Sequence, residues 1–261
     1  MKLTSINLHD TTLPDSIREN FLGVPFYDSS CSPEARVYYA DKDEGYFIKI
    51  SEAGSLRREA MMIDYFASIG LSKSTFSYEC GERDILITKK ILGEDLTSDV
   101  YLSDPVRLAV NMGKMLRALH ETNAKDCPIK DRCSEYLANF HEGYKICRFD
   151  PSFIDKTLNI GTPDIAYEYV LGNAHLLKNE VLLHGDFCLP NVIFNDWSLS
   201  GYIDLGAAGI GDRHIDLFWG AWTLNFNLGT DDFRDIFFDS YGRELVDKEK
   251  LLLVSVCEAF G

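Results

Sequence analysis

The sequence predicts an α+β protein of two parts, a small part of mostly antiparallel strands over residues 1–92 and a larger helical part over 93–261. Two observations predict this division. Short aromatic and β-branched runs, separated by turn residues, dominate the first part, as expected for hairpins. Apolar residues at helical spacing dominate the second part. A chain of 261 residues is long enough to bury a core in both.

In the first part, two strands are expected at 35–40 and 45–50, because the aromatic-rich runs ARVYYA and GYFIKI flank the turn sequence DKDE. An amphipathic helix is expected over 55–70, with Gly70 as its stop signal. Strands at 76–80 and 84–91 follow around the turn GER. The resulting order is strand, strand, helix, strand, strand.

In the second part, helical spacing predicts a helix over 105–122 that begins with Pro105 at its first position. Further helices are expected over 133–147 and from Thr162 to about Lys178, with a loop between them. Short strands are expected at VLLH, VIFN and GYIDL, with NDWSLS as a turn. Two closing helices are expected in DDFRDIFFDSYG and DKEKLLLVSVCEAF.

The composition is that of an ordinary globular protein, with 46% apolar and 26% charged residues. The net charge of -15, from 26 basic and 41 acidic side chains, argues against a nucleic-acid partner. It also suits a cationic ligand, although from charge alone a solvated acidic surface is the simpler explanation. The sequence carries no signal of an oligomeric state.

The seven cysteines are odd in number and form no CxxC pair, which argues against a zinc site or a disulfide framework. Reduced thiols favour a cytoplasmic location. The N-terminal segment lacks the apolar core of a signal peptide, and runs such as LLLVSV at 251–256 are too short to span a bilayer. We therefore expect no membrane partner.

The most informative stretch is LLHGDFCLPNVIF at 182–194, followed by YIDLGAAG. Asp, Asn, Gly and Pro are common in turns, so turn chemistry is one explanation. The other is a site, because strand GYI can pair with VIF and bring Asp204 back beside Asn191. Carboxylate and amide oxygens are the ligands that Mg²⁺ prefers, and Asp186 would then be left to orient an incoming hydroxyl.

The order of these residues is that of a kinase active site. His184 to Asn191 read H-G-D-x-x-x-x-N, and D-L-G begins at Asp204, in the order of the kinase catalytic loop and its metal-binding Asp. Together with IDLGAAGIGDRHIDL, the chain resembles the aminoglycoside phosphotransferase family, and within it most of all the aminoglycoside 3′-phosphotransferases. The similarity covers most of the chain, and residues 182–217 are its most specific part.

The resemblance implies a two-lobed, protein-kinase-like fold, with a nucleotide-binding lobe over 1–92 and a catalytic and substrate-binding lobe over 93–261. It implies transfer of the γ-phosphoryl group of ATP or GTP to the 3′-hydroxyl of an aminoglycoside, and hence antibiotic resistance. In that reaction Asp186 receives the hydroxyl proton, while Asn191 and Asp204 hold Mg²⁺. His184 and Asp216 would support the catalytic loop.

A nucleotide site also needs a Lys on a strand held by a Glu on a helix. Lys49 in FIKI and Glu59 ten residues later fit, although a surface ion pair would give the same pattern. By resemblance, Phe47 lies over the adenine ring, and Ile91 belongs to the segment whose backbone binds adenine. Ser32 would contact phosphate from the loop SSCSP, which lacks the glycines of G-x-G-x-x-G.

On the substrate side, the resemblance assigns amine binding to acidic residues of the C-terminal helix and of a mid-chain loop. Glu258 keeps one of the C-terminal acids, Cys257 replaces the other, and Gly261 extends past the aromatic residue. Asp150 and Asp155 are the loop candidates. In D-L-G-A, Ala207 stands where Arg is frequent in the family.

Other functions stay open at this point. A related kinase could act on choline, homoserine, a macrolide or a sugar. A non-catalytic, kinase-like binding module is disfavoured by the complete Asp–Asn–Asp set. A protein kinase is disfavoured because the sequence after D-L-G has no A-P-E segment.

Overall fold

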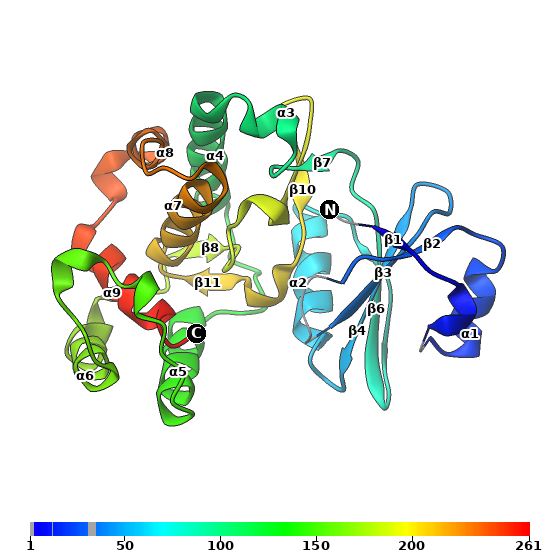
Figure 1. Ribbon diagram of the computed structural model, residues 1–261, viewed down its shortest axis with the longest axis horizontal. Helices are drawn as coiled ribbons and strands as arrows, with labels where there is room; N and C mark the ends of the chain where they lie inside the picture. Colours follow the sequence, from blue (N-terminus) through cyan, green and yellow to red (C-terminus); the bar gives the residue numbers. More distant parts are fainter. Residues whose placement is uncertain (1–2, 12, 31–34) are drawn as a thin grey trace. The chain divides into compact units, whose positions relative to one another are not determined.

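The computed structural model describes residues 3–11, 13–30 and 35–261, which group into two compact units (Figure 1). The first unit combines the chain up to Asp95 with Pro190–Gly206, and the second combines Leu96–Leu189 with Ala207–Gly261. The sequence-based boundary near residue 92 did not assign 190–206 to the first part. The functional roles expected of the two lobes stay a prediction.

The first unit contains a six-stranded antiparallel sheet in the order β1-β2-β3-β4-β6-β5. The four strands predicted from aromatic and β-branched runs are all present within about two residues of their expected bounds. The two N-terminal strands were not predicted. The strands are β1 (Thr4–Ser5), β2 (Phe26–Asp28), β3 (Arg36–Ala40), β4 (Tyr46–Glu52), β5 (Thr75–Cys80) and β6 (Arg83–Lys89).

Alternation along β4 sorts its side chains between two faces of the sheet. Ile48 and Ile50 are buried in an apolar cluster with Phe21 and Phe26, near the short helix α1 (Asp15–Arg18). Lys49 lies on the other face, because successive side chains of a strand point in opposite directions. The predicted helix is α2 (Arg57–Ser68), which buries Met62, Ile63 and Phe66.

A second, three-stranded sheet of the first unit has the order β10-β9-β7, formed by β7 (Glu94–Asp95), β9 (Val192–Asn195) and β10 (Ser198–Tyr202). The predicted hairpin is confirmed, with Tyr202 opposite Val192. Its turn is shorter than expected, because Asp196 and Trp197 alone occupy it. Both have positive φ, at 48° and 61°, as a two-residue hairpin turn with right-handed strand twist requires.

The second unit is mostly helical, with one small sheet of β8 (Val181–Leu183) and β11 (Gly209–Gly211). The predicted helices α4, α5, α6, α8 and α9 are present, although the third ends at Asn173 rather than near Lys178. Helices α3 and α7 were not predicted. The helices are α3 (Asp99–Leu102), α4 (Pro105–His120), α5 (Arg132–Lys145), α6 (Pro163–Asn173), α7 (His214–Leu228), α8 (Arg234–Tyr241) and α9 (Lys248–Glu258).

The C-terminal residues pack into the core of the second unit. Phe260 is fully buried and lies edge-on to Phe140 of α5, with ring centroids 5.0 Å apart. Leu253 and Val254 place α9 in the same cluster. This packing fixes the end of α9, where Glu258 lies. Within the described part of the chain, none of the helices is both long and apolar enough to cross a bilayer.

Candidate active site

In the first unit, Lys49 joins two acidic residues. Its Nζ lies 2.8 Å from Glu59 Oε2 and 2.8 Å from Asp204 Oδ1. Strand β4 supplies the lysine, the first turn of α2 supplies Glu59, and the segment after β10 supplies Asp204. Burial opposes the charge on Lys49, but the two carboxylates outweigh it and raise the pKa of the lysine above its ordinary value. The ammonium is therefore firmly charged. Burial also raises the pKa of Glu59, and the Lys49 charge offsets part of that rise.

The hairpin of β9 and β10 brings Asn191 close to the residue before Asp204. Ile203 donates its backbone N–H to the Asn191 carbonyl at 3.0 Å. Tyr202 is anchored in turn, because its N–H donates to the Leu71 carbonyl at 2.9 Å. Asp204 itself has φ of 58°, in the left-handed region that Asp and Asn tolerate better than most residues.

The donor set of Asn191 and Asp204 suits Mg²⁺. Mg²⁺ is usually held by one or two protein oxygens together with substrate phosphates. The Asp204 side chain is half exposed, so its carboxylate can be reached. Among the described residues, no three or more His, Cys, Asp or Glu side chains cluster in a way that could hold a metal ion.

In the second unit, Asp186 lies on a loop after β8 that Asp216 holds in place. The Asp216 carboxylate accepts the backbone N–H of His184 at 2.8 Å and that of Gly185 at 2.7 Å. Gly185 has φ of 86°, and a Cβ at this position would collide with the carbonyl of Ala207. Only glycine fits this turn without strain. The loop that carries Asp186 is thus held by the Asp216 carboxylate and by the close approach of Gly185 to Ala207.

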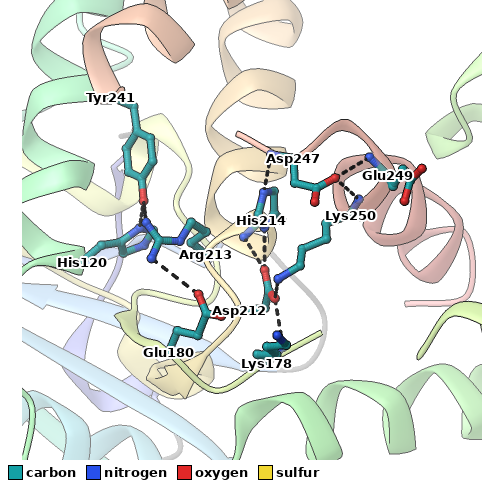
Figure 2. A network of polar contacts seen from close by, with 10 residues as sticks. All are labelled: His120, Lys178, Glu180, Asp212, Arg213, His214, Tyr241, Asp247, Glu249 and Lys250. Carbon is teal, nitrogen blue, oxygen red and sulfur yellow. Dashed lines mark hydrogen bonds and ion pairs between the residues drawn. The ribbon is translucent and has the colours of Figure 1, made fainter. Parts of the chain in front are cut away.

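A buried chain of hydrogen bonds extends behind Asp216. His120 Nε2 lies 3.1 Å from Asp216 Oδ2, and His120 Nδ1 lies 2.8 Å from the hydroxyl of Tyr241. Because a carboxylate only accepts, Nε2 carries the proton and Nδ1 accepts from Tyr241. Burial lowers the pKa of His120, so the ring is neutral. Arg213 donates to the same hydroxyl at 3.2 Å (Figure 2).

The hydrogen bonds of His120 were not predictable from local sequence patterns. Its partners Asp216 and Tyr241 lie 96 and 121 residues away in the chain. The only sequence signal was a histidine at the end of a predicted helix, which does not identify a partner.

Helix α9 is anchored at its start by a second buried network (Figure 2). Asp212 Oδ2 accepts from Lys250 Nζ at 2.8 Å, and Oδ1 lies 2.6 Å from His214 Nδ1. His214 Nε2 accepts the backbone N–H of Asp247, the residue that caps α9. These bonds hold the pKa of Asp212 below its ordinary value despite burial. The helix that carries Glu258 is therefore fixed at both ends.

A cavity of about 190 Å³ brings Asp186 and Glu258 together within the second unit. Burial raises the pKa of Glu258 to about 7, while hydrogen bonds from Tyr136 and Trp219 act in the opposite direction. The sequence did not identify Tyr136 or Trp219, although Tyr136, Asn139 and Phe140 have the spacing of one helix face. The lining residues are Tyr136, Asn139, Phe140, Gly185, Asp186, Trp219, Cys257, Glu258 and Gly261.

The two loop acids have local roles and do not line this cavity. Asp150 accepts the backbone N–H of Ser152 at 2.9 Å, and Asp155 accepts that of Thr157 at 2.8 Å. Their contact with a substrate stays a prediction. Cys257 does line the cavity, in the place where a second acid was expected, and burial raises the pKa of its thiol well above the ordinary value. It contributes no negative charge.

Three further residues were expected at the nucleotide site, namely Phe47, Ile91 and Ser32. Phe47 lies on the same strand and face as Lys49 and packs against Tyr39, with ring centroids 5.1 Å apart. The Ile91 side chain is buried, and the adenine contact expected of its backbone stays a prediction. Ser32 lies outside the described residues.

Comparison with known proteins gives the family. Residues 33–252 match the model of the phosphotransferase enzyme family. A "probable aminoglycoside 3′-phosphotransferase" of Lactococcus lactis subsp. lactis (strain IL1403) is 45% identical over 260 residues, which cover 99% of each chain.

Solved structures show the same fold. The crystal structure of an aminoglycoside-3′-phosphotransferase of type VIII matches with a TM-score of 0.77 at 21% identity, covering 94% of this chain and 97% of that one. An aminoglycoside phosphotransferase of Streptomyces rimosus, in complex with ADP and streptomycin, matches with a TM-score of 0.72 at 18% identity, covering 86% and 90%. The predicted α+β, kinase-like fold class is confirmed. The chain belongs to the phosphotransferase enzyme family.

Proposed function

We propose that this protein transfers the γ-phosphoryl group of ATP or GTP to the 3′-hydroxyl of an aminoglycoside and so confers antibiotic resistance. The observation that carries the proposal is the cavity shared by Asp186 and Glu258. A kinase for a polyamine sugar needs a group that receives a hydroxyl proton and an anion that binds an amine, both within reach of one substrate. The name of the L. lactis relative, 45% identical along the whole chain, points to the same reaction.

Asp186 is the catalytic residue of the proposed reaction. It orients the acceptor hydroxyl and takes its proton as the bond from that oxygen to the γ-phosphorus forms and the bond from phosphorus to the nucleoside diphosphate breaks. Because the transition state of phosphoryl transfer is loose, positioning and charge neutralisation contribute more than base strength. The bonds from Asp216 to the His184 and Gly185 backbone serve this positioning.

The first unit would hold the nucleotide. Lys49, steadied by Glu59 at 2.8 Å, would pair with the α- and β-phosphates, and Phe47 would cover the adenine ring. Asn191 and Asp204 would hold Mg²⁺, which when bound neutralises charge on the phosphates. We also place the protein in the cytoplasm, where nucleotide is available and thiols stay reduced. The described cysteines Cys80, Cys133, Cys147, Cys188 and Cys257 are free thiols.

The test is a coupled assay of ADP release by the purified protein with kanamycin, neomycin, a 3′-deoxy kanamycin and choline as acceptors. We expect turnover with kanamycin and neomycin and none with the 3′-deoxy compound, which lacks the acceptor oxygen. Mass and NMR spectra of the product should show one phosphate at the 3′ position.

A related kinase for another hydroxyl compound is the alternative. Phosphorylation of choline but not of kanamycin would overturn the proposal, and a positive result with homoserine, a macrolide or a simple sugar alone would do the same. Absence of Mg²⁺-dependent nucleotide binding would instead favour a non-catalytic binding module.

A further inference from the structure

The carboxylate of Glu258 is contacted from two helices other than its own. Tyr136 of α5 donates its hydroxyl to Glu258 Oε1 at 2.8 Å, and Trp219 of α7 donates its Nε1–H to the same oxygen at 3.2 Å. Within the described residues, no hydrogen-bond donor is found for the second oxygen, Oε2. Both donors therefore bind Oε1, and Oε2 remains available to a ligand.

The open oxygen lies where a ligand can reach it. Glu258 is enclosed by packed helices, yet it lines the cavity and keeps an intermediate exposure. Its neutral neighbour Cys257 and the acidic Asp186 line the same cavity. The Arg132 guanidinium of α5, a further charge near Glu258, is already paired with Glu135 at 2.5 Å.

A carboxylate enclosed in this way gains most from a charged donor. Burying an ionised carboxylate is costly unless it is paired and hydrogen-bonded. An ammonium group supplies both the charge and the hydrogen bond, and such charge-assisted bonds are stronger than bonds between neutral groups. With Oε1 held by two side chains that are themselves packed in helices, the direction of Oε2 is fixed before the ligand arrives.

We propose that Tyr136 and Trp219 are positioning residues, which orient the Glu258 carboxylate so that Oε2 receives a substrate ammonium group while the acceptor hydroxyl lies at Asp186. This inference rests on the proposed aminoglycoside kinase function. The pair would thereby help to determine which hydroxyl of a polyamine sugar reaches Asp186.

The test removes each donor while keeping an aromatic ring. In Tyr136→Phe, we expect the KM for kanamycin to rise about tenfold, because a hydrogen bond to a charged group is lost, with kcat and the KM for ATP changed by less than about twofold. Trp219→Phe should give an effect in the same direction and provides a second, independent variant. The matched controls are Tyr144→Phe on α5, whose hydroxyl donates to Asp164 at 2.7 Å, and Trp222→Phe on α7.

The pH profile separates positioning from mere stabilisation of the fold. The bond from Tyr136 favours the ionised form of Glu258, so its loss should move the acidic limb of kcat/KM for kanamycin to higher pH. A loss of fold stability alone would not shift this limb.

Two outcomes count against the inference and can be told apart. If the wild-type protein phosphorylates kanamycin, but Tyr136→Phe and Trp219→Phe match their controls in KM and in pH profile, the positioning role is wrong and the proposed function stands. If the wild-type protein turns over none of the aminoglycosides while it phosphorylates choline, both the proposed function and this inference are overturned.

Discussion

The ammonium nitrogen of Lys49 lies 2.8 Å from a carboxylate oxygen of Asp204, a residue 155 positions later in the chain. We propose both residues for the nucleotide site, Lys49 for the phosphates and Asp204 for Mg²⁺. Each neutralises the other, and Glu59 shares the lysine. In the proposed complex, the phosphates would take the place of Asp204 beside Lys49, and Mg²⁺ would take the place of Lys49 beside Asp204. Neither side chain would be left without an opposite charge.

Asp204→Asn tests the metal role with little change to the backbone, because Asn also tolerates the left-handed conformation seen at this residue. We expect kcat/KM to fall by about 10²-fold or more, since the negative charge toward the metal is lost. The Mg²⁺ dependence of transfer and the circular dichroism spectrum are the measurements. Asp196→Asn is the matched control, because Asp196 is another left-handed aspartate, exposed in the hairpin turn. Equal activity of both variants would contradict the assignment.

Asp186→Asn tests the catalytic role. The amide keeps the size of the side chain but cannot take the hydroxyl proton, so we expect kcat to fall by about 10²–10⁴-fold. Nucleotide affinity, measured by isothermal titration calorimetry, should stay nearly unchanged. A variant that loses only nucleotide affinity would show that Asp186 has another role.

Lys49→Met removes the charge while keeping an unbranched side chain. We expect weaker nucleotide binding by about tenfold or more, because a charge-assisted contact with the phosphates is lost. The buried Glu59 would also lose its cation, so the melting temperature of the protein should fall. Calorimetric titration with ATP and thermal unfolding measure the two effects. The control is Lys89→Met, at an exposed position of the neighbouring strand β6, which should change neither.

Tyr241→Phe tests the buried chain behind the catalytic loop. Without the hydroxyl, His120 Nδ1 loses its donor, and the free energy of unfolding should fall by about 1–3 kcal/mol. We expect kcat to fall severalfold while the KM values stay the same. The reason is that these hydrogen bonds support the loop that carries Asp186 but do not touch the substrate. Tyr167→Phe is the matched control, since its hydroxyl lies 3.0 Å from His141 Nδ1, away from the loop. Identical kcat values in the two variants would show that these buried hydrogen bonds have no effect on catalysis.

Glu258→Gln tests whether the pKa of this buried carboxyl group is raised, and the test needs only measurements of the free energy of unfolding. The pKa of Glu258 is raised from 4.5 to about 7, so the contribution that its protonated form makes to folding is present at low pH and is lost as the pH rises through about 7. The glutamine variant should therefore gain stability relative to the wild type between pH 5.5 and pH 8.5. The gain between these two pH values is at most about 2 kcal/mol, and less where water in the cavity screens the charge. Urea unfolding of both proteins at the two pH values measures it, and a constant difference would contradict the raised pKa.

The local elements of the fold were predictable because their signals lie within short segments. The aromatic and β-branched runs of β3, β4 and β6 and the hairpin of β9 and β10 depend on neighbouring residues and turns. Helix α7 was missed because it is apolar around most of its circumference, as the consecutive apolar residues Leu217, Phe218 and Trp219 show. Such a helix lacks the one-sided pattern by which amphipathic helices are recognised.

The sequence by itself determined the order Asp186, Asn191, Asp204 and the pairing of Lys49 with a helix acid, because residue type and spacing carry that information. Only the tertiary structure decided which side chains surround these groups. The donors of Glu258 lie 39 and 122 residues away in the chain, and the partners of His120 are as distant. Contacts of this kind arise where helices pack, and packing depends on the whole core, so no local pattern in the chain specifies them.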